Sequence, residues 1–187
     1  MLVCQSIGKN IKKARKILKN GGVIIYPTDT LYGLGADIFN REAVERIFRI
    51  KGRDFKKPLS IMVSSLKQIK NLAWVNQKQE KLIKTILPGP FTVLLKKKKK
   101  ISYNITAGSE KVGLRIPASK ICRQLSKDMP ITTTSANVSG FQPDLNINKI
   151  AKKFKNQTDF ILKGERLSGQ PSIIIDLTEE PFTIFRF

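Results

Sequence analysis

The chain has 187 residues, 41% hydrophobic and 26% charged, and its 35 Lys and Arg against 14 Asp and Glu give a net charge of +21. These proportions exclude an intrinsically disordered protein, and the length fits a single domain over residues 1–187. The chain contains no histidine, which excludes a Ser-His-Asp triad, a Cys-His pair and a histidine zinc site. Any chemistry must therefore use lysine, arginine, hydroxyls, carboxylates, backbone amides or a metal held by oxygen.

Two explanations fit the positive charge. The surface could attract an anionic partner such as RNA, or concentrate a phosphorylated substrate. A compositional bias towards lysine would give the same surplus, because the cations are spread along the whole chain. The run Lys96–Lys100 leaves the same choice between a solvated strand end and contacts with a phosphate backbone.

Location is predicted from what the sequence lacks. No run approaches the roughly 20 apolar residues of a membrane span, and the start MLVCQSIGKN lacks the features of a signal peptide. We therefore expect a cytoplasmic protein without membrane contact. Cys4 and Cys122 lie far apart, which fits reduced thiols and gives neither a disulfide framework nor a pair of metal ligands.

Helical and extended patterns alternate along the chain. Apolar residues at helical spacing predict helices over residues 6–20, 41–52, 65–74, 76–87, 119–128 and 147–154. Gly21 and Gly22 end the first of these helices, and the turn LPGP ends the fourth. Short apolar runs predict strands over residues 23–27, 59–63, 91–96, 112–117, 130–135, 159–163, 172–177 and 182–187. The alternation predicts an α/β fold, and the closing cluster of strands indicates that part of the sheet is antiparallel.

Three stretches combine polar groups with a strand or helix end. YPTDTLYGLG follows an apolar strand and carries Thr28, Asp29, Thr30 and Tyr32, which favours a ligand-binding loop; the alternative is an ordinary strand-to-helix loop. TTTSANVSG carries Ser135 and Asn137 at a strand end, where a hydroxyl and an amide suit an amino acid or a nucleotide. Its alternative is a turn that merely caps the next segment. SGQPSIIIDL likewise places Ser172 at the mouth of a strand.

Two basic features could bind an anion. KGRDFKKPLS brings together Lys51, Arg53, Lys56 and Lys57, which could clamp a triphosphate or could form a solvated helix end. Arg115 interrupts the apolar strand of GLRIP, so its charge must reach solvent or find an anion.

These segments together resemble a known family. YPTDTLYGLG, KGR followed by KPLS, LPGPFTVLL, GLRIP, TTSANVSG and SGQPSIIID are similar, in this order from about residue 21 onwards, to the signature segments of the YrdC/TsaC family of threonylcarbamoyl-AMP synthases. The resemblance implies a twisted, mixed parallel and antiparallel sheet flanked by helices, with a positive concave cleft. It also implies synthesis of threonylcarbamoyl-AMP from L-threonine, bicarbonate and ATP, with Mg²⁺ accompanying ATP and with release of pyrophosphate. Partner proteins would then transfer the threonylcarbamoyl group to tRNA.

The resemblance also implies roles for individual residues. The family's Lys-x-Arg and Ser-x-Asn signature falls on the residues expected to be catalytic, which are Lys51, Arg53, Ser135 and Asn137. The residues expected to hold ATP are Arg53, Lys57, Arg115, Asn137 and Arg186. Those expected to bind threonine are Thr30, Tyr32, Ser135 and Ser172. No residue is expected to form a metal site of its own.

The chain departs from the family pattern at three places. Asp54 stands where proline commonly follows Lys-Gly-Arg, and Met62 stands where many relatives carry a histidine. The chain stops at Phe187, whereas longer relatives append a second domain, so it resembles the short, single-domain form. The effect of these departures on activity stays open.

Two other functions are compatible with the sequence. A basic module that binds tRNA or ribosomal RNA without catalysis would explain the charge, although only 7% of the residues are aromatic. A carbamoyl-handling domain like those of hydrogenase-maturation proteins is similar in sequence but sits in much longer chains. The sequence leaves open the oligomeric state, direct tRNA contact and the base that accepts the threonine amine's proton, for which Asp29 is a candidate by location only.

Overall fold

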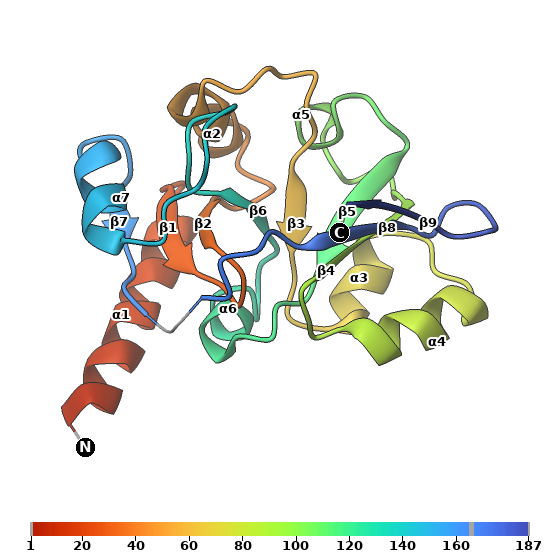
Figure 1. Ribbon diagram of the computed structural model, residues 1–187, viewed down its shortest axis with the longest axis horizontal. Helices are drawn as coiled ribbons and strands as arrows, with labels where there is room; N and C mark the ends of the chain where they lie inside the picture. The colour runs from red at the N-terminus through yellow and green to blue at the C-terminus, as the bar shows by residue number, and fades with distance from the viewer. Residues whose placement is uncertain (1, 165–166, 187) are drawn as a thin grey trace.

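The computed structural model describes residues 2–164 and 167–186, with the backbone alone for residues 2–6 and Arg186 (Figure 1). The helices are α1 Leu2–Lys19, α2 Arg41–Lys51, α3 Leu66–Leu72, α4 Gln77–Ile86, α5 Tyr103–Thr106, α6 Lys120–Leu125 and α7 Ile147–Lys153. The strands are β1 Ile24–Pro27, β2 Tyr32–Gly35, β3 Ser60–Met62, β4 Phe91–Lys96, β5 Lys111–Arg115, β6 Ile131–Ser135, β7 Phe160–Ile161, β8 Ile173–Asp176 and β9 Thr183–Arg186. None of the described helices combines the length and apolar character needed to cross a membrane.

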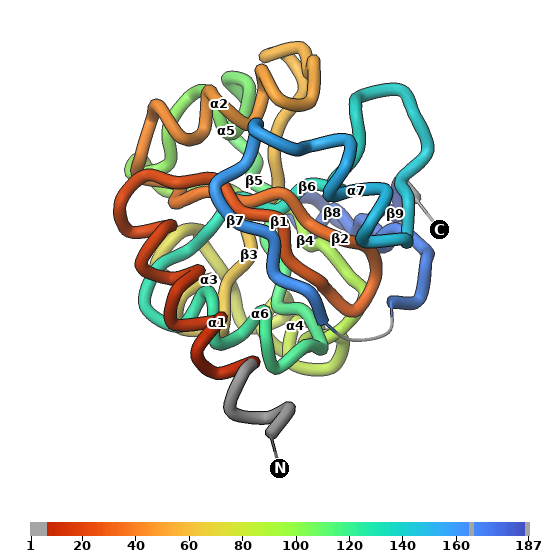
Figure 2. The backbone as a smooth tube through the Cα atoms, turned by 90° about the vertical axis from the view of Figure 1, so that its left-hand side faces the viewer, coloured from red at the N-terminus to blue at the C-terminus, as the bar shows by residue number. Residues whose placement is uncertain are grey.

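The strands of the described residues form one mixed sheet in the order β7-β1-β2-β6-β3-β5-β4-β8-β9. Strand pairs β1/β7, β3/β5 and β4/β8 are parallel, and the others are antiparallel. The predicted α/β fold with a mixed sheet and flanking helices is therefore confirmed. Of the three strands that close the sequence, β8 and β9 form the expected antiparallel pair. β7 instead pairs in parallel with β1, at the opposite end of the sheet (Figure 2).

Two elements differ from the sequence prediction. Residues 28–35 do not form a strand-to-helix loop, because Tyr32–Gly35 is strand β2, paired with β1 in a hairpin. Two glycines in four residues hide this strand, since glycine has low β-propensity. The single turn α5 was also missed, because one helical turn is too short to show a hydrophobic period.

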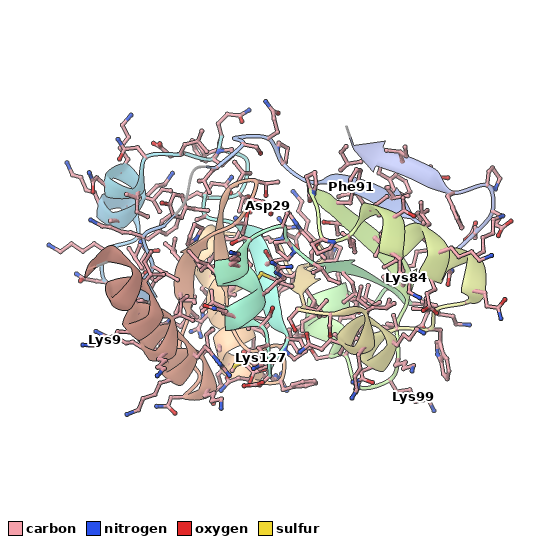
Figure 3. The ribbon with its side chains drawn as sticks, turned by 90° about the horizontal axis from the view of Figure 1, so that it is seen from below. Lys9, Asp29, Lys84, Phe91, Lys99 and Lys127 are labelled. Atoms are coloured by element: carbon pink, nitrogen blue, oxygen red, sulfur yellow. The ribbon has the colours of Figure 1, made fainter. Side chains whose placement is uncertain are left out.

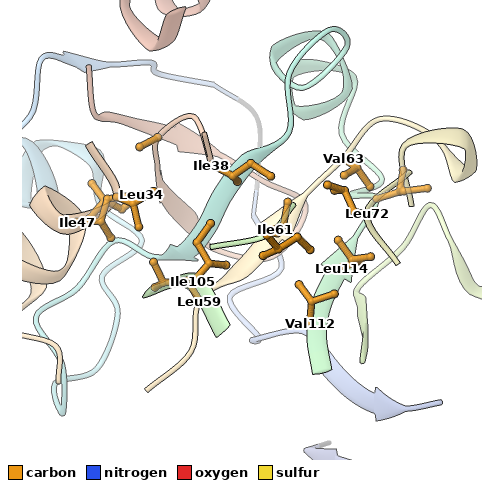
Figure 4. Close-up of a cluster of buried hydrophobic side chains, with 14 of the residues drawn as sticks. Leu34, Ile38, Ile47, Leu59, Ile61, Val63, Leu72, Ile105, Val112 and Leu114 are labelled. Atoms are coloured by element: carbon orange, nitrogen blue, oxygen red, sulfur yellow. The ribbon is translucent and has the colours of Figure 1, made fainter. Parts of the chain in front are cut away.

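Strand residues alternate between two packed regions. The larger apolar cluster, shown in part in Figure 4, joins Ile61, Leu114 and Val112 of the sheet to Ile47 of α2 and Leu72 of α3. The second cluster packs α1 and α6 against β1 through Ile11, Ala14, Leu18, Ile24, Tyr26, Ile121, Cys122 and Leu125. The Cys122 thiol is buried and donates to the carbonyl of Pro27 (3.2 Å), whereas the side chain of Cys4 lies outside the described residues.

The glycines of β2 make room for the ring of Tyr26. A Cβ added at Gly33 would lie 2.8 Å from Cζ of this ring, and one added at Gly35 would lie 2.7 Å from its Cε1. A Cβ at Gly35 would also lie 2.7 Å from the carbonyl oxygen of Thr132. The glycines therefore serve close packing within the hairpin, which fixes the position of the Thr28–Leu31 turn.

We predict that Gly35→Ala lowers the free energy of unfolding by about 1–3 kcal/mol, because the added methyl group meets both a buried ring and a backbone oxygen. Gly8→Ala is the matched control, since no atom lies within 4 Å of a Cβ at this exposed helical position. It should be stabilising by up to about 1 kcal/mol. Denaturant unfolding measures both variants, and an unchanged midpoint for Gly35→Ala would contradict the packing argument.

Candidate active site

A cavity of about 510 Å³ opens on the sheet, within the roughly 300–1,000 Å³ typical of small-molecule sites. It is lined by Thr28, Thr30, Leu31, Tyr32, Gly33, Arg53, Pro58, Leu59, Ser60, Thr92, Leu94, Thr106, Ser109, Lys111, Val112, Gly113, Arg115, Thr133, Thr134, Ser135, Pro171, Ser172, Ile174 and Phe185. Strand alternation explains the lining, since Thr92 and Leu94 of β4 face the cavity whereas Val93 and Leu95 face the core.

One end of the cavity is built from buried hydroxyl groups. The Thr28 Oγ1 accepts hydrogen bonds from the backbone N–H groups of Thr30 (3.0 Å) and Leu31 (3.1 Å), which shapes the turn between β1 and β2. The two threonine hydroxyls lie 2.9 Å apart. On the neighbouring strands, the Ser172 hydroxyl lies 2.9 Å from that of Thr92. These hydroxyls are held in fixed positions, as recognition of a small polar ligand requires.

The anion that pairs with Arg115 is a side chain of the protein itself. Its guanidinium contacts the carboxylate of Asp29 through Nη2 and donates to the Thr30 hydroxyl through Nη1 (2.9 Å). The other Asp29 oxygen accepts from the backbone N–H of Ala118 (3.1 Å). Asp29 lies near the middle of the molecule, in contrast to the peripheral lysines that Figure 3 labels.

One donor of Arg115 has no partner among the described residues. Arg115 is 5% exposed, lines the cavity, and its Nε is buried without a hydrogen-bond acceptor. A buried donor left unsatisfied costs about 1–3 kcal/mol, so an acceptor supplied by a ligand would be stabilising here.

Lys51 joins the two signature segments. Its side chain lies at the C-terminal end of α2, is 1% exposed, and donates from Nζ to the carbonyl oxygens of Ser135 (2.5 Å) and Asn137 (2.7 Å) and to Asn137 Oδ1 (3.1 Å). The Lys51 carbonyl in turn accepts from Ser139 N–H (2.8 Å). The alternative of a solvated helix end is therefore wrong for this lysine, which positions the Ser-x-Asn turn.

Two opposing effects act on the pKa of Lys51. Burial, followed by the nearby charges of Arg53 and Lys153, lowers the pKa of Lys51 to about 7. The three oxygen acceptors oppose this shift, because they favour the protonated ammonium. A neutral amine has only two donors, so it cannot satisfy all three oxygens at once.

The Asn137 side chain is fully engaged in the turn. Its Oδ1 accepts from Lys51 and from the Ser135 hydroxyl (2.5 Å), and its amide donates to the carbonyls of Val138 (3.1 Å) and Phe141 (2.5 Å). The strand β6 ends at Ser135, so the turn begins before Asn137. Ser135 lines the cavity, whereas Asn137 does not.

The other predicted cations differ in their surroundings. Arg53 lines the cavity and donates to the carbonyls of Lys57 (3.1 Å) and Pro58 (2.9 Å), and burial lowers its pKa. The side chains of Lys56 and Lys57 are exposed and do not line the cavity. Arg186 belongs to β9, but its side chain lies outside the described residues.

The comparisons with known proteins identify the family. The sequence model of the Sua5/YciO/YrdC domain, described as telomere recombination, matches residues 16–187. The chain belongs to the Sua5/YciO/YrdC family.

Three relatives show how far the similarity to this family extends. A Methanocaldococcus jannaschii protein provisionally named threonylcarbamoyl-AMP synthase is 38% identical over 179 residues, covering 95% of this chain and 85% of that protein. The crystal structure of Pyrococcus abyssi Sua5 complexed with L-threonine is 36% identical with a TM-score of 0.90, covering 94% of this chain but only 53% of that one. The crystal structure of Escherichia coli YciO is 29% identical with a TM-score of 0.87, covering 94% of this chain and 87% of that one. The chain thus spans about half the length of the Pyrococcus relative.

Most of the residues predicted for the Sua5/YciO/YrdC site lie together. Those that line the cavity are Thr30, Tyr32, Arg53, Arg115, Ser135 and Ser172. Lys51 and Asn137 lie behind it, in the hydrogen-bonded turn. Thr92, Lys111 and Gly113 also line the cavity but were not predicted from the sequence, although Thr92 stands out as a hydroxyl within the apolar strand FTVLL.

The two substitutions relative to the family pattern have clear positions. Asp54 accepts a hydrogen bond from the backbone N–H of Lys56 (2.9 Å), so its carboxylate shapes the turn after α2. Met62 is fully buried in the apolar cluster under α1 and α6 and does not line the cavity.

We predict a specific pH dependence of stability from Lys51. Its pKa is about 7 in the folded protein against 10.5 ordinarily, so between these values the unfolded chain binds more protons, and the contribution of this group to stability rises with pH. Relative to Lys51→Met, the wild-type protein should therefore gain stability between about pH 7 and about pH 9.5 in denaturant titrations.

Lys57→Met is the control for this measurement, because Lys57 is exposed. Removing this surface lysine should not reproduce the pH-dependent difference in stability expected for Lys51→Met. Parallel pH profiles for the wild type and Lys51→Met would show that Lys51 titrates like an ordinary lysine.

Proposed function

We propose that this chain is a threonylcarbamoyl-AMP synthase, which combines L-threonine, bicarbonate and ATP and releases pyrophosphate. The proposal rests on one end of the cavity, where the Nε of Arg115, which has no acceptor in the part of the chain that the structure describes, lies beside fixed hydroxyl groups. Relatives named for this activity, and the Pyrococcus protein crystallised with L-threonine, support the same substrate.

Threonine fits the hydroxyl-lined end of the cavity. Thr30, Tyr32, Ser135 and Ser172 would orient its polar groups, as the family resemblance implies. Arg115 was predicted to hold ATP, but its hydrogen bond to Thr30 favours a role towards the threonine carboxylate. That carboxylate would supply the acceptor that the Arg115 Nε lacks.

ATP would be held mainly by the basic segment after α2. Arg53 lies at the cavity wall, and Lys57 and Arg186 remain the further cations expected to reach the phosphates. Asn137 would act through the turn that it stabilises, because its side-chain donors and acceptor are already used.

The reaction is a sequence of two bond formations. The neutral amine of threonine attacks the bicarbonate carbon, a C–N bond forms, and water leaves to give a carbamate. A carbamate oxygen then attacks the α-phosphorus of ATP, the bond to the β-phosphate oxygen breaks, and pyrophosphate takes the electron pair. Cations fixed in a cleft stabilise the charge that builds on the phosphate oxygens, and alignment of the reactants supplies much of the rate.

Asp29 gains no support as the base for the threonine amine. Its carboxylate already contacts Arg115 and accepts from Ala118 N–H, so both oxygens are used in positioning the guanidinium. A substrate oxygen or water would accept the proton instead.

Mg²⁺ would accompany ATP rather than occupy a protein cage. The described residues contain no group of three or more Cys, Asp or Glu side chains placed to hold a metal. Mg²⁺ commonly keeps several waters and binds substrate phosphates, and this chemistry fits a cavity whose side chains are mainly hydroxyls and cations. Transfer to tRNA by partner proteins, in the cytoplasm, completes the proposal.

The decisive experiment is mass spectrometry of a reaction containing the purified protein, ATP, Mg²⁺ and bicarbonate, with and without L-threonine, together with a pyrophosphate assay. Threonine-dependent threonylcarbamoyl-AMP is the expected product. Untouched ATP with folded protein would overturn the proposal and leave the RNA-binding alternative as the leading function.

Replacing Arg53 tests whether this residue binds ATP. Arg53→Ala should abolish adenylate formation, because a positioned guanidinium is lost from the cavity wall, while the melting temperature changes little. Arg49→Ala is the control, since it removes an exposed arginine of the same helix region that does not line the cavity. Turnover at the wild-type rate in folded Arg53→Ala would remove this residue from the mechanism.

Replacing Ser172 tests whether this residue binds threonine. Ser172→Ala should raise KM for threonine by about tenfold and leave KM for ATP nearly unchanged, because one oriented hydrogen bond is lost at the threonine end. Steady-state kinetics with each substrate varied in turn measure this difference. Equal increases in both KM values would place Ser172 outside the threonine site.

A further inference from the structure

Thr92 carries a buried hydroxyl within the apolar strand β4. It is 2% exposed, lines the cavity and is followed in the strand by Val93, Leu94 and Leu95. Burying a hydroxyl without a hydrogen bond costs free energy, and valine would fill nearly the same volume without this cost. The presence of threonine at this position therefore indicates a specific hydrogen-bond partner.

The partner of this hydroxyl is Ser172, beside the neighbouring strand. Strands β4 and β8 pair in parallel, with Thr92 opposite Ile174, and Ser172 directly precedes β8 (Figure 1). The two hydroxyl oxygens lie 2.9 Å apart. The backbone N–H of Ile173 donates to the carbonyl of Pro90 (2.9 Å), so the backbone next to Ser172 is also fixed to the start of β4.

Packing fixes the direction of the Thr92 side chain. Strand β4 lies between β5 and β8, and a Cβ added at Gly113 of β5 would lie 3.3 Å from the Thr92 methyl carbon Cγ2. The methyl group therefore occupies the space beside this glycine, and the hydroxyl faces β8. Because a β-branched residue has few χ1 rotamers, this arrangement holds the hydroxyl towards Ser172.

The hydrogen bond between the two hydroxyls has a preferred direction. Within the part of the chain that the structure describes, the Ser172 hydroxyl is the hydrogen-bond partner found for Thr92 Oγ1. A threonine hydroxyl has one donor, and buried donors are rarely left unpaired, so Thr92 donates and Ser172 accepts. The Ser172 hydroxyl then keeps its own proton for a different acceptor.

We propose that Thr92 is a positioning residue of the cavity, which acts through Ser172. By donating to Ser172, it turns the serine O–H towards an acceptor of a bound ligand. This role rests on the proposed function, in which Ser172 binds L-threonine, and the acceptor is then an oxygen of that amino acid. The effect of Thr92 on threonine binding is thereby indirect.

The first test compares Thr92→Val, which replaces the hydroxyl by a methyl group of similar size, with Thr92→Ser, which keeps the hydroxyl. Thr92→Val should raise KM for threonine by about fivefold, as expected for one lost neutral hydrogen bond, and leave kcat and KM for ATP nearly unchanged. Thr92→Ser should stay within about twofold of the wild type. Isothermal titration calorimetry with L-threonine alone should show the same changes in Kd.

A double-mutant cycle shows whether Thr92 acts through Ser172. In the Ser172→Ala background, Thr92→Val should raise Kd for L-threonine by less than about twofold, because the hydroxyl that Thr92 orients is absent. A fivefold effect that persists in this background would overturn the indirect role.

Thr132→Val is the matched control for the loss of a buried hydroxyl. Thr132 is 0% exposed, its Oγ1 accepts from the backbone N–H of Ala36 (3.0 Å), and it does not line the cavity. This variant should lower the melting temperature and keep the wild-type Kd for L-threonine. If Thr92→Val does not fold, Thr92→Ala removes the same hydroxyl without adding a methyl group, and the same rise in Kd is expected.

The wild-type protein separates failure of this role from failure of the synthase proposal. Wild-type affinity for L-threonine in folded Thr92→Val, or equal losses in Thr92→Ser or Thr132→Val, would overturn the role of Thr92 alone. Absence of both threonine binding and threonylcarbamoyl-AMP formation in the wild-type protein would overturn the synthase proposal and, with it, this role.

Discussion

A buried ammonium ion connects the parts of the chain on which the site depends. Lys51 ends α2, and its Nζ reaches oxygens of Ser135 and Asn137 at the end of β6. Removing this charge from water is costly, and three oxygen acceptors offset only part of the cost, since the pKa of Lys51 is still lowered to about 7. The helix and the turn are consequently held in one relative position, which also places Arg53, two residues further on, at the cavity wall.

The sheet leaves room for the cavity because helices cover its faces unevenly. The helices α1 and α6 pack on β1 through an apolar cluster, while neighbouring strands turn hydroxyls and a glycine towards the open space. An ion pair between the buried Arg115 and the partly buried Asp29 lies at the cavity. The lining of the cavity and the apolar core therefore use alternate residues of the same strands.

The sequence predicted most of the elements, because apolar periodicity and capping residues are local signals. Asn40, for example, caps α2 through the backbone N–H of Ala43 (2.9 Å). Strand β2 was missed because its glycines serve the ring of Tyr26, a contact that no local pattern shows. The same limit applies to the site. The motifs identified Arg115 and Lys51, but only the three-dimensional structure shows that Asp29 is the anion of the first and that the second supports a turn.

Phe185 lies in a wall of the cavity that can move without unfolding of the rest of the protein. Phe185 lines the cavity from β9, which is the last strand in the sheet order and pairs with β8 alone. Strands at a sheet edge can detach at less than the free energy of global unfolding. The cavity can thus widen at this side by fraying of one short strand, while the hydroxyl-lined end, which is fixed by the interior of the sheet, keeps its shape.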